Sequence, residues 1–129
     1  MTDHYWFSLF VFLNASMLIL LAMNISRLRI QQKVANGDGG NVIVKKAIRA
    51  HGNGVEHVMV AGLIVLALVF GETPEWYMAT MVLGFSVARI VHAVGMLRPH
   101  FNARRAGAGA TYFFELFGVA GVCIYALAV

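Results

Sequence analysis

The stretch that decides the fold is IRAHGNGVEHVMVAGLIVLALVFG, which covers residues 48–71. Its first half carries Arg49, Asn53 and Glu56 and runs without a break into a long apolar segment. A helix that crosses a membrane needs roughly 20 mostly apolar residues. The stretch therefore predicts a membrane-spanning helix that carries polar side chains into hydrocarbon, where each of them needs a partner, a ligand or water.

The rest of the chain has the same character. Of its 129 residues, 60% are hydrophobic and only 12% are charged, whereas soluble domains carry about 25% charged residues. Four segments are long and apolar enough to span a bilayer: Tyr5–Ser26, Ala50–Phe70, Trp76–Leu97 and Ala106–Val129. We therefore predict an all-α integral membrane four-helix bundle in which residues 1–129 form a single domain.

The charges predict how the bundle is oriented. Nine of the ten Lys and Arg residues lie within residues 27–49 and 98–105, in or beside two connections on the same side of the membrane. The other side carries Asp3, Glu72 and Glu75. By the positive-inside rule, the basic loops are cytoplasmic and both termini are outside. The basic loops are also expected to contact membrane lipids with anionic headgroups. Because loop asymmetry accounts for the basic charge, we expect no nucleic-acid partner.

The polar residues of the opening stretch fall on one helical face. At 100° per residue, Arg49, Asn53 and Glu56 lie within about 60° of one another. Arg89 and His92 share a face of the third predicted helix in the same way. A guanidinium, an amide and a carboxylate on one face suit a zwitterionic ligand, because Arg binds carboxylates through paired N–H groups and Glu binds ammonium.

A structural alternative explains the same residues without a ligand. A charge at the bilayer centre costs about 2.5–3.5 kcal/mol on insertion scales, so Arg89 would pair with Glu56 or with Glu115 of the fourth helix. In that interpretation the histidines of the helices are hydrogen-bonded bundle residues. Their spacing lacks the carboxylate or Cys partners of a zinc site, so we expect no metal.

The segment RAHGNGVEH (49–57) resembles the signature of the MAPEG superfamily, the membrane-associated proteins of eicosanoid and glutathione metabolism. That signature has Arg-Ala, then Asn three residues after the Ala, then an acidic residue three positions further on. RLR at 27–29, ARIVH at 88–92 and the basic pair at 104–105 are also similar to the family. The resemblance covers all four helices, and the short loops are most similar to small bacterial inner-membrane members.

The resemblance implies a homotrimer that holds glutathione at each subunit interface, open to the cytoplasmic side. The glutathione-binding residues that it implies are Arg27, Arg49, Asn53, Glu56 and His92. Arg27 would come from a neighbouring protomer and close the site. Arg104 or Arg105 would be catalytic by stabilising the glutathione thiolate, and the family spacing does not decide between them.

The expected activity is that of a glutathione transferase or peroxidase. Free thiols titrate at about 8.5, and an adjacent Arg favours the thiolate. Such a thiolate attacks lipophilic electrophiles or reduces lipid hydroperoxides that arrive through the bilayer. The chain departs from the family pattern at Gly52, Met96, Ala106 and Gly109, where the family has Arg, Tyr, Ser and Tyr, and Tyr112 lies one turn on from the last. The ligand-anchoring residues are therefore better kept than the hydroxyl residues.

Two other classes of protein fit the length and the four spans. One is a small four-helix multidrug exporter with a Glu inside the membrane, although Arg49 and Arg89 near Glu56 would repel its cationic substrates. The other is a non-catalytic membrane bundle in which the polar stripe only sets the register of the helices.

Overall fold

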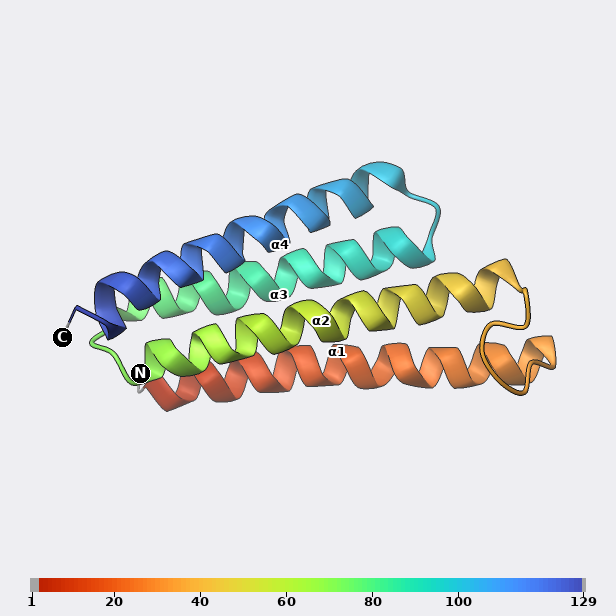
Figure 1. Ribbon diagram of the computed structural model, residues 1–129, viewed down its shortest axis with the longest axis horizontal. Coiled ribbons are helices and arrows are strands. Elements are labelled where there is room, and N and C mark those ends of the chain that lie inside the picture. The colour runs from red at the N-terminus through yellow and green to blue at the C-terminus, as the bar shows by residue number, and fades with distance from the viewer. Residues whose placement is uncertain (1–2, 129) are drawn as a thin grey trace.

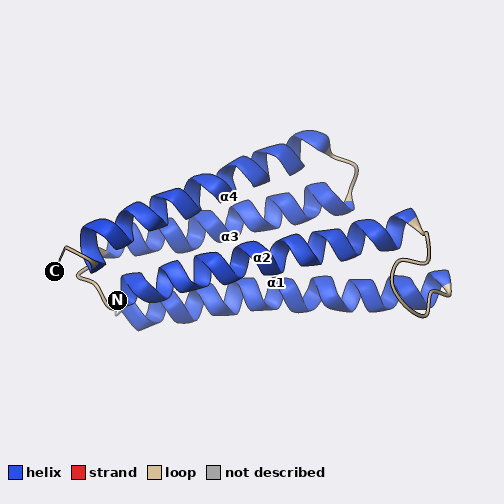
Figure 2. Cartoon of the chain, viewed as in Figure 1, coloured by secondary structure: helices blue, strands red, loops and turns tan. Residues whose placement is uncertain are grey.

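In the computed structural model, residues 3–128 are described, and they form a bundle of four long helices joined by short connections (Figures 1 and 2). The helices are α1 (Asp3–Gln32), α2 (Val42–Val69), α3 (Glu75–Leu97) and α4 (Phe101–Gly121), and α4 continues into the π-helical segment η1 (Val122–Ala126). Each of the four is long and apolar enough to cross a membrane. The predicted all-α four-span architecture is confirmed, although Val129, the predicted end of the last span, lies outside the described residues.

The basic end of α2 extends beyond the predicted span. Helix α2 begins at Val42 rather than Ala50, and α1 continues to Gln32 rather than ending at Ser26. Asn41 sets the start of α2, because its side-chain oxygen accepts hydrogen bonds from two backbone N–H groups of the first turn, at 2.9 and 3.2 Å. An N-terminal cap of this kind satisfies donors that have no partner inside the helix.

The connection between α1 and α2 reverses the chain through glycines. Gly37, Gly39 and Gly40 have φ values of +61°, +58° and +71°, a left-handed conformation that costs glycine little. The Arg29 guanidinium donates to the backbone oxygen of Gly37 at 3.0 Å and ties the loop to α1. Residues 35–41, which contain these glycines, therefore form the turn at which the chain reverses.

The two basic connections lie at the same end of the bundle. Figure 1 shows both termini and the α2–α3 connection at one end, and the α1–α2 and α3–α4 connections at the other. We call the latter the basic end, because nine of the ten Lys and Arg residues lie on or beside these two connections. That the basic end faces the cytoplasm stays a prediction.

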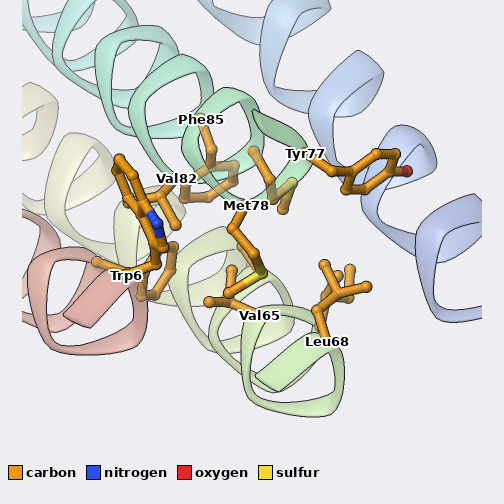
Figure 3. Close-up of a cluster of buried hydrophobic side chains, with 11 residues drawn as sticks. Trp6, Val65, Leu68, Tyr77, Met78, Val82 and Phe85 are labelled. Carbon is orange, nitrogen blue, oxygen red and sulfur yellow. The ribbon is translucent and has the colours of Figure 1, made fainter. Parts of the chain in front are cut away.

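The apolar core fills the half of the bundle near the termini (Figure 3). The cluster includes Trp6 and Phe10 of α1, Leu68 of α2, and Met78 and Phe85 of α3. Many large apolar side chains outside this core are exposed, among them Leu20 (65%), Leu63 (67%) and Leu116 (71%). Exposed apolar surface of this extent is expected where helices face lipid or another subunit.

Candidate functional site

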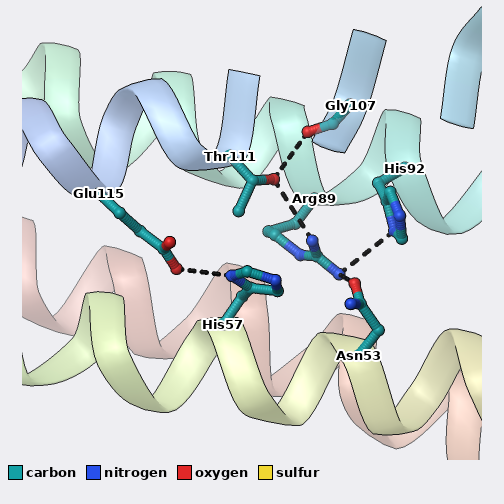
Figure 4. Close-up of polar contacts among 7 residues, drawn as sticks. All are labelled: Asn53, His57, Arg89, His92, Gly107, Thr111 and Glu115. Carbon is teal, nitrogen blue, oxygen red and sulfur yellow. Dashed lines mark hydrogen bonds and ion pairs between the residues drawn. The ribbon is translucent and has the colours of Figure 1, made fainter. Parts of the chain in front are cut away.

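A buried arginine occupies the half of the bundle near the basic end. The Arg89 side chain is only 1% exposed. Its Nη2 donates to Asn53 Oδ1 at 2.8 Å and lies 3.4 Å from His92 Nδ1, while its Nη1 donates to Thr111 Oγ1 at 3.3 Å (Figure 4). The Thr111 hydroxyl donates in turn to the backbone oxygen of Gly107 at 2.7 Å. Neutral side chains from α2, α3 and α4 therefore hold this guanidinium.

Neither carboxylate that the structural alternative offers to Arg89 pairs with it directly. Glu115 pairs instead with His57, with 2.7 Å between Oε1 and Nδ1 (Figure 4), and Glu56 is exposed. Within residues 3–128, Arg89 has no direct ion pair with a carboxylate. The interpretation of His57 and His92 as hydrogen-bonded bundle residues is confirmed. In the same described range, no three His, Cys, Asp or Glu side chains are grouped to hold a metal ion.

A pocket of about 540 Å³ lies beside this network at the basic end. Its polar lining is Lys45, Lys46, Arg49, Asn53, His92 and Arg104, and its apolar lining is Val42, Met96 and Ala108. All the charged side chains that line it are cations. Because Asn53 Oδ1 accepts from Arg89, Asn53 offers its N–H groups to a ligand. The pocket is therefore built from cations and hydrogen-bond donors, which suits an anionic ligand.

Close contact between α3 and α4 places Arg104 next to His92. A Cβ atom added to Gly107 would lie 2.5 Å from the backbone nitrogen of His92, and one added to Gly95 would overlap the backbone nitrogen of Arg104. Each helix therefore has a glycine where the backbone of the other helix comes closest. Small residues allow membrane helices to approach at backbone distance, and here the approach brings a basic side chain of α4 to a pocket lined mainly by α2.

The structure brings together four of the seven predicted site residues, namely Arg49, Asn53, His92 and Arg104. Arg105 does not line the pocket, and its guanidinium lies 5.4 Å from the centre of the Phe101 ring. Glu56 does not line the pocket, and its side chain is exposed. Arg27 lines a separate pocket and donates to Asn24 Oδ1 at 2.8 Å. Roles for Glu56 and Arg27 in binding glutathione stay predictions.

Sequence analysis missed three residues of this region. Lys45 and Lys46 line the pocket because α2 begins before the predicted span. Asn41 was the sequence signal for this earlier helix start, because a cap at Asn41 places Lys45 on the same helix as Arg49, one turn earlier. Thr111 was also missed. Its position four residues after Gly107 allows its hydroxyl to bond within α4 and still accept from Arg89.

Four apolar spans that enclose a buried arginine, with a cationic pocket at their basic end, define a polytopic membrane protein with a ligand-sized site. The MAPEG family model matches residues 7–125, and the chain belongs to the MAPEG family. It is 32% identical over 105 residues to the inner membrane protein YecN of Escherichia coli strain K12, across 81% of this chain and 80% of that protein. YecN of an O6:H1 strain of Escherichia coli matches to the same extent. The relatives and the four spans indicate a multi-pass protein of the bacterial inner membrane.

Proposed function

We propose that the protein binds glutathione in the pocket at the basic end. The observation that carries this proposal is the convergence of Arg49, Asn53, His92 and Arg104 from three helices on one pocket without an anionic lining residue. Glutathione carries two carboxylates, and Arg49 and the Asn53 N–H groups are suited to hold one of them. The same cationic lining disfavours the positively charged substrates of a multidrug exporter.

The amino group of glutathione needs an acceptor that the pocket lining lacks. Glu56 lies on α2 beyond Asn53, with its side chain exposed on the outer surface of the protomer. We therefore propose that glutathione extends from the pocket toward Glu56 and that a homotrimer encloses it. A trimer would also cover some of the apolar surface that a single protomer leaves exposed.

The chemistry that we propose uses Arg104 as the catalytic residue. Its positive charge at the pocket favours the glutathione thiolate, and the thiol proton leaves to water. In the transferase reaction a sulfur–carbon bond forms while the bond to the leaving group breaks. In the peroxidase reaction two glutathione thiols are oxidised to a disulfide, and a hydroperoxide is reduced to an alcohol and water.

A lipophilic second substrate has an approach along the helices that carry Arg104 and His92. An apolar groove of about 490 Å³ lies between α3 and α4, lined by side chains such as Val87, Val91 and Phe114. Gly107, whose backbone touches His92, also lines this groove. The groove therefore reaches the contact between the two helices, next to His92, which lines the cationic pocket.

A glutathione titration of the purified protein by calorimetry tests the proposal. We expect saturable binding by the wild type and at least tenfold weaker binding by Arg49→Ala, equivalent to about 1.4 kcal/mol. Lys33→Ala is the matched control, because it removes a cation from the same end but outside the pocket. Wild-type protein that binds no glutathione would refute the proposal. Binding without turnover of an aryl halide or a lipid hydroperoxide would refute only the enzyme part.

A further inference from the structure

A second groove runs along the outer surface between α1 and α3. Its volume is about 430 Å³, and it is lined by α1 side chains between Leu13 and Asn24 and by α3 side chains between Ile90 and Leu97. Ser16 and Asn24 are its only polar lining residues. Ile90 is 47% exposed although it sits in a groove. The groove therefore offers an apolar channel that is open to the membrane.

A different pocket, the one lined by Arg27, continues this groove at the basic end. The pocket shares Asn24 and Leu97 with the groove and adds Arg27 and Lys46. Arg27 Nη2 donates to Asn24 Oδ1 at 2.8 Å, which holds the guanidinium at the mouth of the groove. With its oxygen occupied in this way, Asn24 offers N–H donors. An apolar channel thus ends in two cations and an amide donor.

The dimensions of the groove match one leaflet of a bilayer. At 1.5 Å per residue, the eleven-residue step from Leu13 to Asn24 spans about 16 Å, close to half of the roughly 30 Å hydrocarbon core. Tyr5 and Trp76 are exposed at the opposite end of the bundle, where aromatic residues commonly mark the membrane interface. Arg27 lies about 33 Å along α1 from Tyr5. The groove therefore runs from the bilayer midplane to the interface at the basic end.

We propose that this groove binds one anionic phospholipid from the leaflet at the basic end. One acyl chain lies between α1 and α3, and the headgroup phosphate lies between Arg27 and Lys46, with Asn24 donating to a headgroup oxygen. Charge complementarity identifies the occupant, since each cation near the surface favours an anionic lipid by a measurable factor. A second protein chain in this groove would instead need anionic side chains of its own next to Arg27 and Lys46, at the membrane–water interface.

The lipid site gives Arg27 a different role from the one that the family resemblance implies. In that resemblance, Arg27 would instead close the glutathione site of a neighbouring protomer. The two roles separate experimentally, because one changes the affinity for lipid and the other changes the affinity for glutathione. Arg27 and the groove lie outside the proposed glutathione pocket, whereas Lys46 lines both pockets, so Arg27 is the residue whose replacement separates the two sites.

Native mass spectrometry of the protein released from nanodiscs tests this site. The discs contain phosphatidylglycerol and phosphatidylcholine with identical acyl chains, and the measured quantity is the ratio of the two lipids retained per protomer. We expect the wild type to prefer phosphatidylglycerol and Arg27→Gln to lose roughly fivefold of that preference. Arg27→Lys should keep most of it, and Lys33→Gln, which removes a cation outside the groove, should keep all of it.

A second variant tests the apolar channel separately from the charge. Ser16→Phe fills the groove without changing the charge at its mouth, and we expect it to reduce retention of both lipids at least severalfold. Circular dichroism and the oligomeric mass show whether each variant is folded. Equal retention of the two lipids by the folded wild type would overturn the proposal. An unchanged lipid ratio in Arg27→Gln together with weaker glutathione binding would also overturn it and would assign Arg27 to the neighbouring site.

Discussion

Replacement of Arg104 and of Arg105 by Ala is the sharpest comparison that the site allows. The two residues are adjacent on α4, are both exposed and lie within 6.0 and 5.4 Å of the same Phe101 ring. Only Arg104 lines the pocket with Arg49 and His92. The two substitutions therefore remove the same charge from the same helix and differ in whether that charge reaches the ligand.

The expected size of the effect follows from the exposure of Arg104. Water screens an exposed ion pair, so charge attraction alone contributes about 1 kcal/mol or less. A hydrogen bond to a charged group that is shielded by a bound ligand contributes roughly 1.5–3 kcal/mol. We therefore expect Arg104→Ala to weaken the binding of ionised glutathione by about tenfold to a hundredfold. Arg105→Ala should change it by less than about twofold, as is usual for a surface charge away from the ligand.

Three measurements check this comparison on the purified protein. They are calorimetric titration with glutathione, thiolate absorbance in the far ultraviolet, and the rate of conjugation to an aryl halide. Arg104→Ala should lose the absorbance and the conjugation rate together, while Asn53 and Arg49 still hold the ligand. Equal effects of the two substitutions, or a larger effect of Arg105→Ala, would show that the pocket is not where the thiol is bound.

Three further predictions concern recognition, packing and assembly. Glu56→Gln should weaken glutathione binding at least tenfold, about 1.4 kcal/mol, because it removes the negative charge that attracts the ammonium group of glutathione. Glu72→Gln at the opposite end is the calorimetric control, and equal affinities of the wild type and Glu56→Gln would contradict the assignment. Gly107→Ala should lower the thermal unfolding temperature, because its Cβ would lie 2.5 Å from the His92 backbone. Gly109→Ala, with open space around its Cβ, should raise that temperature slightly through higher helix propensity, and similar shifts in the two variants would refute the packing argument. Native mass spectrometry in detergent should show a trimer, and a monomer or dimer alone would contradict it.

The fold was predictable because membrane spans are a strong signal. In hydrocarbon every backbone polar group must be bonded within the structure, so a long apolar segment becomes a helix. The helix ends were less predictable, because hydropathy marks where the bilayer ends and says little about where a helix ends. Helix α2 continues to Val42 through basic residues, and only its cap at Asn41 reveals this. The pocket residues Lys45 and Lys46 were missed for that reason.

The part of the site that lies on a single helix, α2, was predictable from the sequence. The stripe of Arg49 and Asn53 follows from helical spacing, and both residues line the pocket. Partners on other helices do not follow from spacing. Charge complementarity favoured a carboxylate for Arg89, yet Asn53 and Thr111 hold it, because helix packing decides which side chains meet. The same packing separates Arg104 from Arg105, which no local pattern distinguishes.

The buried Arg89 links ligand binding to the stability of the bundle. Neutral oxygens hold its guanidinium, and its Nε has no hydrogen-bond partner among the described residues, so its charge is not cancelled by direct pairing with a carboxylate. A charge in a low-dielectric interior acts over a longer distance than one in water, and Asn53, which accepts from Arg89, also lines the pocket. An anion in that pocket should therefore stabilise the buried guanidinium as well as the exposed cations. A ligand that binds only the folded protein stabilises it by an amount that grows with the logarithm of ligand concentration, and we expect part of that stabilisation to arise at Arg89.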